Sequence, residues 1–183
     1  MGQRGFRESL AVGKIGESAI AEWLRSRGNY VLPVYEIEMS ANKGPRLFTP
    51  KSDLIAPDLL VFKVSGEIVW IEAKHKSAFS PHRLSNNRLV TGIDLRHYLH
   101  YCELASQSPW PVWLLFLQRG SSAANCPSGT PTGLFGNNLA ILQKCENHRH
   151  GNWGTSGMVY WAIDKLKKLA TIEELEALQT KAA

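Results

Sequence analysis

The chain has 183 residues, of which 44% are apolar and 20% are charged, and its formal net charge is +5. A chain of this length can bury a sizeable core, so we expect one domain over residues 1–183. No apolar run reaches the roughly 18 residues of a membrane span, and the first ten residues lack the apolar stretch of a secretory signal. We therefore expect no membrane partner and a cytoplasmic location. Three cysteines are too few, and odd in number, for a disulfide framework.

Apolar periodicity predicts a mixed succession of helices and strands. In chain order we expect a helix at 9–27, a strand at 30–39, a loop at 40–53, a hairpin at 57–74, a basic loop at 75–91, a helix at 93–106 and a buried strand at 112–118. Beyond these we expect a loop at 119–138, a short strand or helical turn at 139–145, a strand at 157–163 and a C-terminal helix in two pieces, 164–170 and 171–181. The second piece begins with Thr171-Ile172-Glu173-Glu174, which resembles a capping box. This order predicts an α/β fold, with helices flanking a mixed central sheet.

The hairpin at 57–74, PDLLVFKVSGEIVWIEAK, has a register that depends on its turn. A two-residue turn would place Asp58 and Glu72 on opposite faces, because side chains alternate along a strand. A three-residue loop at 64–66, with Gly66 in the left-handed region, moves the register by one and sets the two carboxylates opposite each other. We predict the three-residue loop.

Two carboxylates placed this way repel each other unless a cation lies between them. A rigid pair of oxygen ligands with room for water and a phosphate suits Mg²⁺ or Mn²⁺. Lys74 lies two residues beyond Glu72 on the same face. Its amine is placed to orient a water, to stabilise a developing oxyanion or, with a lowered pKa, to act as a base. The alternative is a solvated hairpin end in which Glu72 and Lys74 form a weak surface pair.

Pro57-Asp58, thirteen intervening residues and Glu72-Ala73-Lys74 resemble the PD-(D/E)xK superfamily of restriction-endonuclease-like nucleases. The resemblance includes Glu17 on the preceding helix and covers about residues 9–118. The segments WIEAKHKSAFSPHR and GIDLRHYLHY are similar to phage- or prophage-type members, and Holliday junction resolvases are among the similar nucleases. Residues 119–183 form a peripheral part that matches no family pattern.

The resemblance implies a restriction-endonuclease-like core and a metal-dependent DNA endonuclease that hydrolyses phosphodiester bonds and leaves a 5′ phosphate. It implies metal ligands at Asp58 and Glu72, together with the backbone carbonyl of Ala73. It also implies a catalytic Lys74 and a supporting Glu17, which is a further candidate metal ligand. The expected partner is DNA, with branched DNA among the candidate substrates, and a homodimer would supply two active sites.

The segment after the hairpin is basic, which favours a polyanionic partner. Phosphate contacts are predicted for His75, Lys76, Arg83, Arg88 and Arg96, and the alternative for each is a solvated surface position.

Cys126, Cys145, His148 and His150 form a candidate zinc set, although their spacing lacks a Cys-x2-Cys knuckle. Three hypotheses therefore stay open. The chain is a Mg²⁺-dependent DNA endonuclease, a catalytically silent nucleic-acid-binding module of the same fold, or a small zinc-binding structural protein.

Overall fold

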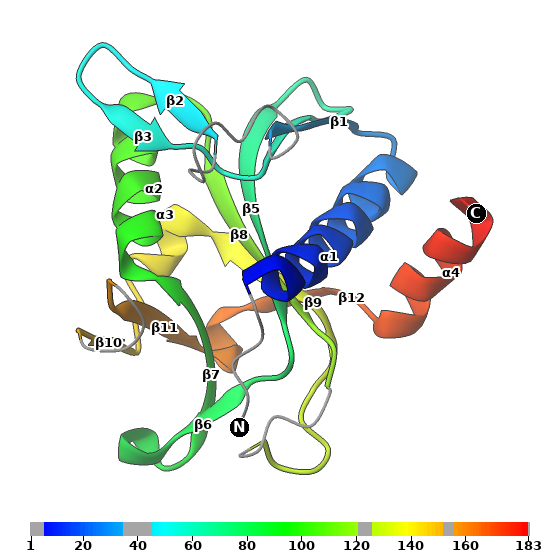
Figure 1. Ribbon diagram of the computed structural model, residues 1–183, viewed down its shortest axis with the longest axis vertical. Helices are drawn as coiled ribbons and strands as arrows, with labels where there is room; N and C mark the ends of the chain where they lie inside the picture. Colours follow the sequence, from blue (N-terminus) through cyan, green and yellow to red (C-terminus); the bar gives the residue numbers. More distant parts are fainter. Residues whose placement is uncertain (1–5, 35–44, 121–125, 152–155, 183) are drawn as a thin grey trace.

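A computed structural model of the chain describes residues 6–34, 45–120, 126–151 and 156–182 (Figure 1). Its helices are α1 (Phe6–Ser26), α2 (Leu95–Gln107), α3 (Leu139–Leu142) and α4 (Ile172–Ala182), with short 3-10 helices at Arg83–Ser85 and Ile163–Lys165. Its strands are β1 (Tyr30–Pro33), β2 (Arg46–Phe48), β3 (Asp53–Ile55), β4 (Leu59–Phe62), β5 (Ile68–Lys76), β6 (Ser80–His82), β7 (Arg88–Asp94), β8 (Val112–Gln118), β9 (Gly133–Asn138), β10 (His148–His150), β11 (Met158–Ala162) and β12 (Lys167–Ala170). None of the helices in these ranges is long and apolar enough to cross a membrane.

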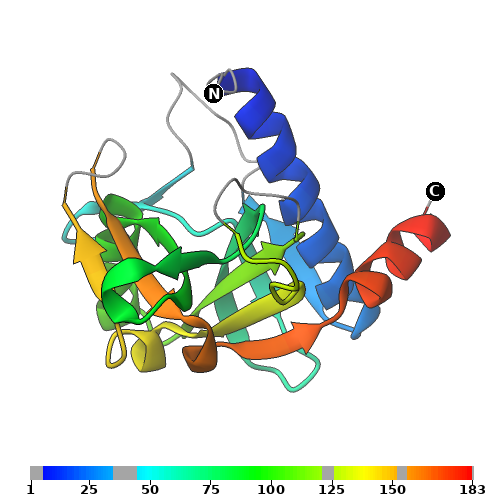
Figure 2. The ribbon, with the colours of Figure 1, turned by 90° about the horizontal axis from the view of Figure 1, so that it is seen from below.

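A mixed six-stranded sheet, in the order β1-β4-β5-β8-β9-β12, forms the centre of the molecule. β5 and β8 are parallel, and the other neighbouring strands of this sheet are antiparallel. A four-stranded sheet in the order β10-β11-β7-β6 and the β2-β3 hairpin complete the strands. Figures 1 and 2 show α1 and α4 on one side of the central sheet and α2 with the four-stranded sheet on the other. The predicted α/β fold with a mixed central sheet flanked by helices is confirmed.

The central sheet separates two apolar clusters, because side chains alternate along its strands. On β8, Leu115 and Leu117 pack in the cluster that contains the buried face of α1. Leu114 and Phe116 pack instead in the cluster that contains residues of α2 and β11. A strand buried on both faces carries a continuous apolar run, which is why 112–118 could be predicted from the sequence.

The start of α4, the helical turn α3 and the strand β11 also follow the prediction. The capping box at the start of α4 is present: the Thr171 N–H donates to Glu174 Oε2 at 2.7 Å, and the Glu174 N–H donates to Thr171 Oγ1 at 3.2 Å. The segment at 139–145 begins with the helical turn α3, and the strand expected at 157–163 is β11.

Four predicted elements were wrong, and all four were short or irregular segments. The loop at 40–53 includes β2 and the start of β3, and the basic loop at 75–91 includes the end of β5, all of β6 and the start of β7. The loop at 119–138 ends in β9, and the helical piece at 164–170 is largely the strand β12, which pairs with β9. β2, β3, β6 and β12 have only three or four residues each, too few to show a periodicity. β9 is longer, but its partner β12 lies far from it in sequence. In the strand expected at 30–39, β1 ends at Pro33, and residues 35–39 lie outside the described ranges.

Candidate active site

The β4-β5 hairpin closes with a three-residue loop at residues 64–66. The Lys63 N–H donates to the Glu67 carbonyl at 2.8 Å, and the Gly66 N–H donates to the Lys63 carbonyl at 2.9 Å. Gly66 has φ +85°, in the left-handed region that glycine adopts without steric cost. The loop predicted from the sequence is therefore confirmed.

This loop fixes the register of the strands that carry the acidic residues. Leu59 pairs with Ile71, so Asp58, one residue earlier, lies level with Glu72. Side chains level with each other in an antiparallel pair share a face of the sheet, and residues two apart on one strand share it too. Asp58, Glu72 and Lys74 therefore point to the same side, toward α2.

The three side chains are in contact. Lys74 Nζ forms an ion pair with Glu72 Oε1 and lies 3.9 Å from Asp58 Oδ2. The Ala73 N–H donates to Asp58 Oδ2 at 2.8 Å, which orients the Asp58 carboxylate. The Glu72 side chain is 1% exposed, whereas those of Asp58 and Lys74 are 15% and 27% exposed. Solvent therefore reaches the lysine and the aspartate but not the glutamate.

Burial and mutual charge shift the ionisation of this group. Burial, followed by the negative charge of Glu72, raises the pKa of Asp58 from 3.8 to about 7. Burial opposes the ammonium form of Lys74, but the charges of Glu72 and Asp58 together raise the pKa of Lys74 above its ordinary value. Lys74 is thus a cation at neutral pH, held by two carboxylates that repel each other.

Helix α1 lies against β5 through a glycine. A Cβ on Gly16 would lie 2.5 Å from the His75 Cβ, so any larger residue would force the helix away from the strand. The next residue, Glu17, is half-buried. Its charge contributes to the raised pKa of Lys74, less than Glu72 and Asp58 do. The structure therefore brings the predicted Glu17 within electrostatic range of the site.

The two carboxylates fit a hard divalent cation. Both Glu72 oxygens are buried, Oε1 is ion-paired with Lys74, and ionisation of Asp58 beside them is unfavourable. The Lys74 ammonium already places positive charge at this point. The described residues contain no group of three His, Cys, Asp or Glu side chains arranged for a metal. Two carboxylates with backbone, water and phosphate oxygens are the usual ligands of Mg²⁺ in phosphoryl chemistry.

The predicted phosphate contacts are spread over the molecule. His75 lies beneath Gly16 of α1, on the other face of β5. Lys76 shares the face of Lys74, and burial, followed by the charge of Lys74, lowers the pKa of Lys76 to about 8.

The three arginines of this set are all exposed and lie on other elements. Arg83 is in a 3-10 helix, Arg96 is in the first turn of α2, and Arg88 forms an ion pair with Asp164 at 2.6 Å.

The candidate zinc residues do not form a ligand set. Cys126 Sγ lies 2.7 Å from Thr130 Oγ1, and Cys145 Sγ donates to the Ile141 carbonyl at 3.2 Å. His148 stacks on other rings, as described below. The described residues give the zinc hypothesis no support.

Sequence reasoning missed two neighbours of the site on α2, His97, whose pKa is lowered by burial and then by the charge of Lys74, and Tyr101. The Tyr101 side chain is 1% exposed, and burial, followed by the charges of Glu72 and Asp58, raises its pKa well above 10.0. The only signal in the sequence for Tyr101 was its position on the apolar face of a helix, which does not distinguish a residue beside the carboxylates from any other core residue.

No family model and no curated protein matches this chain. Among solved structures it is similar to Hjc, a Holliday junction resolvase from Archaeoglobus fulgidus, with a TM-score of 0.47, 9% identity, and coverage of 84% of this chain and 90% of that one. It is also similar to a nuclease from a fusellovirus, with a TM-score of 0.45, 13% identity, and coverage of 98% of this chain and 95% of that one. The function proposed below rests on the geometry of the site.

Proposed function

We propose that this chain is a metal-dependent DNA endonuclease of the PD-(D/E)xK type. One observation supports this most directly: the three-residue loop at 64–66 sets Asp58 opposite Glu72 and brings Lys74 into contact with both. A solvated hairpin end would not bury Glu72 to 1% exposure or raise the pKa of Asp58 to about 7.

Each residue has a role that follows from its surroundings. Asp58 and Glu72, with the carbonyl of Ala73, would hold Mg²⁺ or Mn²⁺, which supplies charge neutralisation at the phosphate and a water of lowered pKa. Lys74, as an ammonium, donates to a non-bridging phosphate oxygen and stabilises the charge that develops there. Glu17 supports this position of Lys74 through its charge. Water adds to phosphorus and the 3′ oxygen leaves, which gives the 5′ phosphate that the resemblance implies.

A catalytically silent nucleic-acid-binding module is the second candidate. The observation in its favour is that Lys74 already forms ion pairs with both carboxylates and so supplies positive charge at this point without a metal. In that case the three residues would be a structural ion-pair network, and substitutions there would change stability without revealing any turnover.

A cleavage assay separates the two candidates. Duplex, single-stranded, flap and four-way DNA are incubated with Mg²⁺ or Mn²⁺ and with parent, Glu72→Gln or Lys74→Ala protein. Glu67→Gln and Lys63→Ala are matched controls, because they lie on the same hairpin and pair with each other at 2.7 Å near its turn.

We expect the site variants to lose about 10²- to 10³-fold in rate and the controls to keep the parent rate. Cleavage by Lys74→Ala at the parent rate would refute the role of Lys74. Metal-independent DNA binding without cleavage of any of the four substrates would favour the silent module. The four-way substrate tests whether branched DNA is preferred, and light scattering tests the predicted homodimer.

A further inference from the structure

A hollow of about 530 Å³ lies on the four-stranded sheet, apart from the carboxylates. Val159 and Trp161 of β11 point into the core, so the intervening Tyr160 points to the outer face of this sheet. We call this feature the ring hollow, and its polar lining includes His82, Arg83, Asn87, His148, His150 and Tyr160.

Three rings border the ring hollow as a stacked column. His82 and His148 lie 3.6 Å apart between ring centroids with an interplanar angle of 12°, and His148 and Tyr160 lie 4.5 Å apart at 6°. The rings come from β6, β10 and β11, and all three are half-buried. Gly92 of β7 pairs with Tyr160, and a Cβ there would lie 2.7 Å from Tyr160 Cδ1. The glycine therefore leaves the space that the tyrosine ring occupies.

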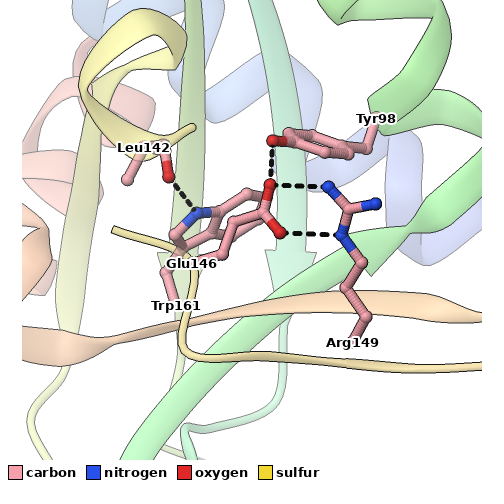
Figure 3. Close-up of polar contacts among 5 residues, drawn as sticks. All are labelled: Tyr98, Leu142, Glu146, Arg149 and Trp161. Carbon is pink, nitrogen blue, oxygen red and sulfur yellow. Dashed lines mark hydrogen bonds and ion pairs between the residues drawn. The ribbon is translucent and has the colours of Figure 1, made fainter. Parts of the chain in front are cut away.

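Polar contacts fix the strand that supplies the middle ring (Figure 3). Arg149, next to His148, donates two hydrogen bonds to Glu146, at 2.7 and 2.9 Å. The Tyr98 hydroxyl of α2 donates to the same carboxylate, and the Arg149 guanidinium lies 5.5 Å from the centre of the Tyr98 ring. The Trp161 indole N–H donates to the Leu142 carbonyl at 2.9 Å. His82 Nδ1 lies 2.7 Å from Ser85 Oγ, and His148 Nδ1 lies 2.8 Å from Asn147 Nδ2. The ring column is thus held in place before any ligand binds, which lowers the entropy cost of binding.

The charge of the ring hollow is neutral to positive. Among the described residues that line it are one arginine and three histidines, and no aspartate or glutamate. The nearby Asp164 is paired with Arg88 and with Lys165. Flat ring faces, a guanidinium and an amide in one place are the groups that contact the bases and phosphates of a nucleic-acid strand.

The segment of chain that directly follows the carboxylates leads to the ring hollow. β5 carries Glu72 and Lys74 and leads directly into β6, which carries His82 (Figure 1). The eight residues from Lys74 to His82 span at most about 28 Å of extended chain. At about 3.4 Å per nucleotide, a stacked strand covers that distance within about eight nucleotides.

We propose that the ring hollow binds one strand of the DNA substrate at a distance from the scissile phosphate, with a base against the ring column and a phosphate beside Arg83. As a substrate subsite it rests on the proposed endonuclease function. The binding itself is testable without cleavage.

The test measures the anisotropy of a fluorescently labelled single strand of about 20 nucleotides, titrated in chelator at several salt concentrations. Arg83→Ala should weaken binding and reduce the slope of log K against log salt by about one, because one phosphate contact is lost. Tyr160→Leu should weaken binding about 5- to 100-fold without changing the slope, and Tyr160→Phe, which keeps the ring, should bind as the parent does. Arg27→Ala is the matched charge control, because Arg27 is exposed at the end of α1, beyond the central sheet, over the ring of Trp23.

The outcomes separate this inference from the proposed function. Loss of binding in Arg83→Ala and Tyr160→Leu, with no cleavage by the parent, would support the ring hollow as a DNA-binding site and refute the endonuclease. Metal-dependent cleavage by the parent, with parent affinity in both variants, would support the endonuclease and overturn the ring hollow. Circular dichroism of each variant ensures that a loss of affinity is not a loss of fold. If Arg27→Ala weakened binding as much as Arg83→Ala does, the ring hollow would also be overturned as a DNA-binding site, because the effect would then come from net charge alone.

Discussion

Replacing Asp58 with asparagine removes a carboxylate that is costly to ionise in the folded protein and keeps an oxygen that can accept the Ala73 N–H. Burial, followed by the charge of Glu72, raises the pKa of Asp58 from 3.8 to about 7. Between these values the folded protein binds the Asp58 proton more tightly than the unfolded chain does. The free energy of unfolding of the parent therefore falls as the pH rises through this window, and above it this contribution is constant.

The magnitude follows from the width of the window that the experiment covers. Between about pH 5 and about pH 8, only the two pH units below the folded pKa contribute, and these correspond to about 3 kcal/mol. The metal-free Asp58→Asn protein lacks this loss, so its stability relative to the parent should increase by about 3 kcal/mol over that range. The effect of this substitution on stability should thus shift in the stabilising direction as the pH rises.

Urea unfolding of chelator-treated protein, followed by tryptophan fluorescence, measures this difference at both pH values. Asp53→Asn is a suitable control, because Asp53 is exposed in β3. Adding Mg²⁺ at about 100 times its Kd should stabilise the parent by about 3 kcal/mol and have little effect on Asp58→Asn. If the difference between Asp58→Asn and parent were the same at both pH values, the electrostatic account of this site would be wrong.

Two further predictions concern the packing that positions the site. Gly16→Ala should reduce the free energy of unfolding by about 1–3 kcal/mol despite the better helix propensity of alanine, because its methyl group would overlap His75. Thermal unfolding measures this, with Gly151→Ala as the control because a methyl group at position 151 meets open space. A Gly16→Ala protein as stable as the parent, or more stable, would contradict the prediction. Deleting Ser65 should leave a two-residue turn that still joins Lys63 to Glu67, so Asp58 should stay opposite Glu72 on the same face. A cleavage assay with calorimetric Mg²⁺ titration should then show that activity and Mg²⁺ binding are retained, and loss of both in a folded protein would refute the register argument.

The register of the hairpin was determined by local sequence. Loop length, the glycine at position 66 and the alternation of apolar residues all lie within 57–74, and they suffice to bring Asp58, Glu72 and Lys74 together. The capping box at Thr171 and the apolar run at 112–118 are local in the same sense. Interactions among neighbours in sequence can be predicted without knowing where the rest of the chain lies.

Tertiary structure alone decided the remaining features. β9 and β12 are strands because partners distant in sequence complete their hydrogen bonds. The ring column joins side chains of three strands and depends on a glycine in a fourth, and no spacing in the sequence indicates such a contact. The raised pKa of Asp58 has the same origin, because burial by distant segments is its largest cause. The sequence thus determined which groups stand side by side on the hairpin, and the packing of distant segments decided how strongly they interact and what else lies near them.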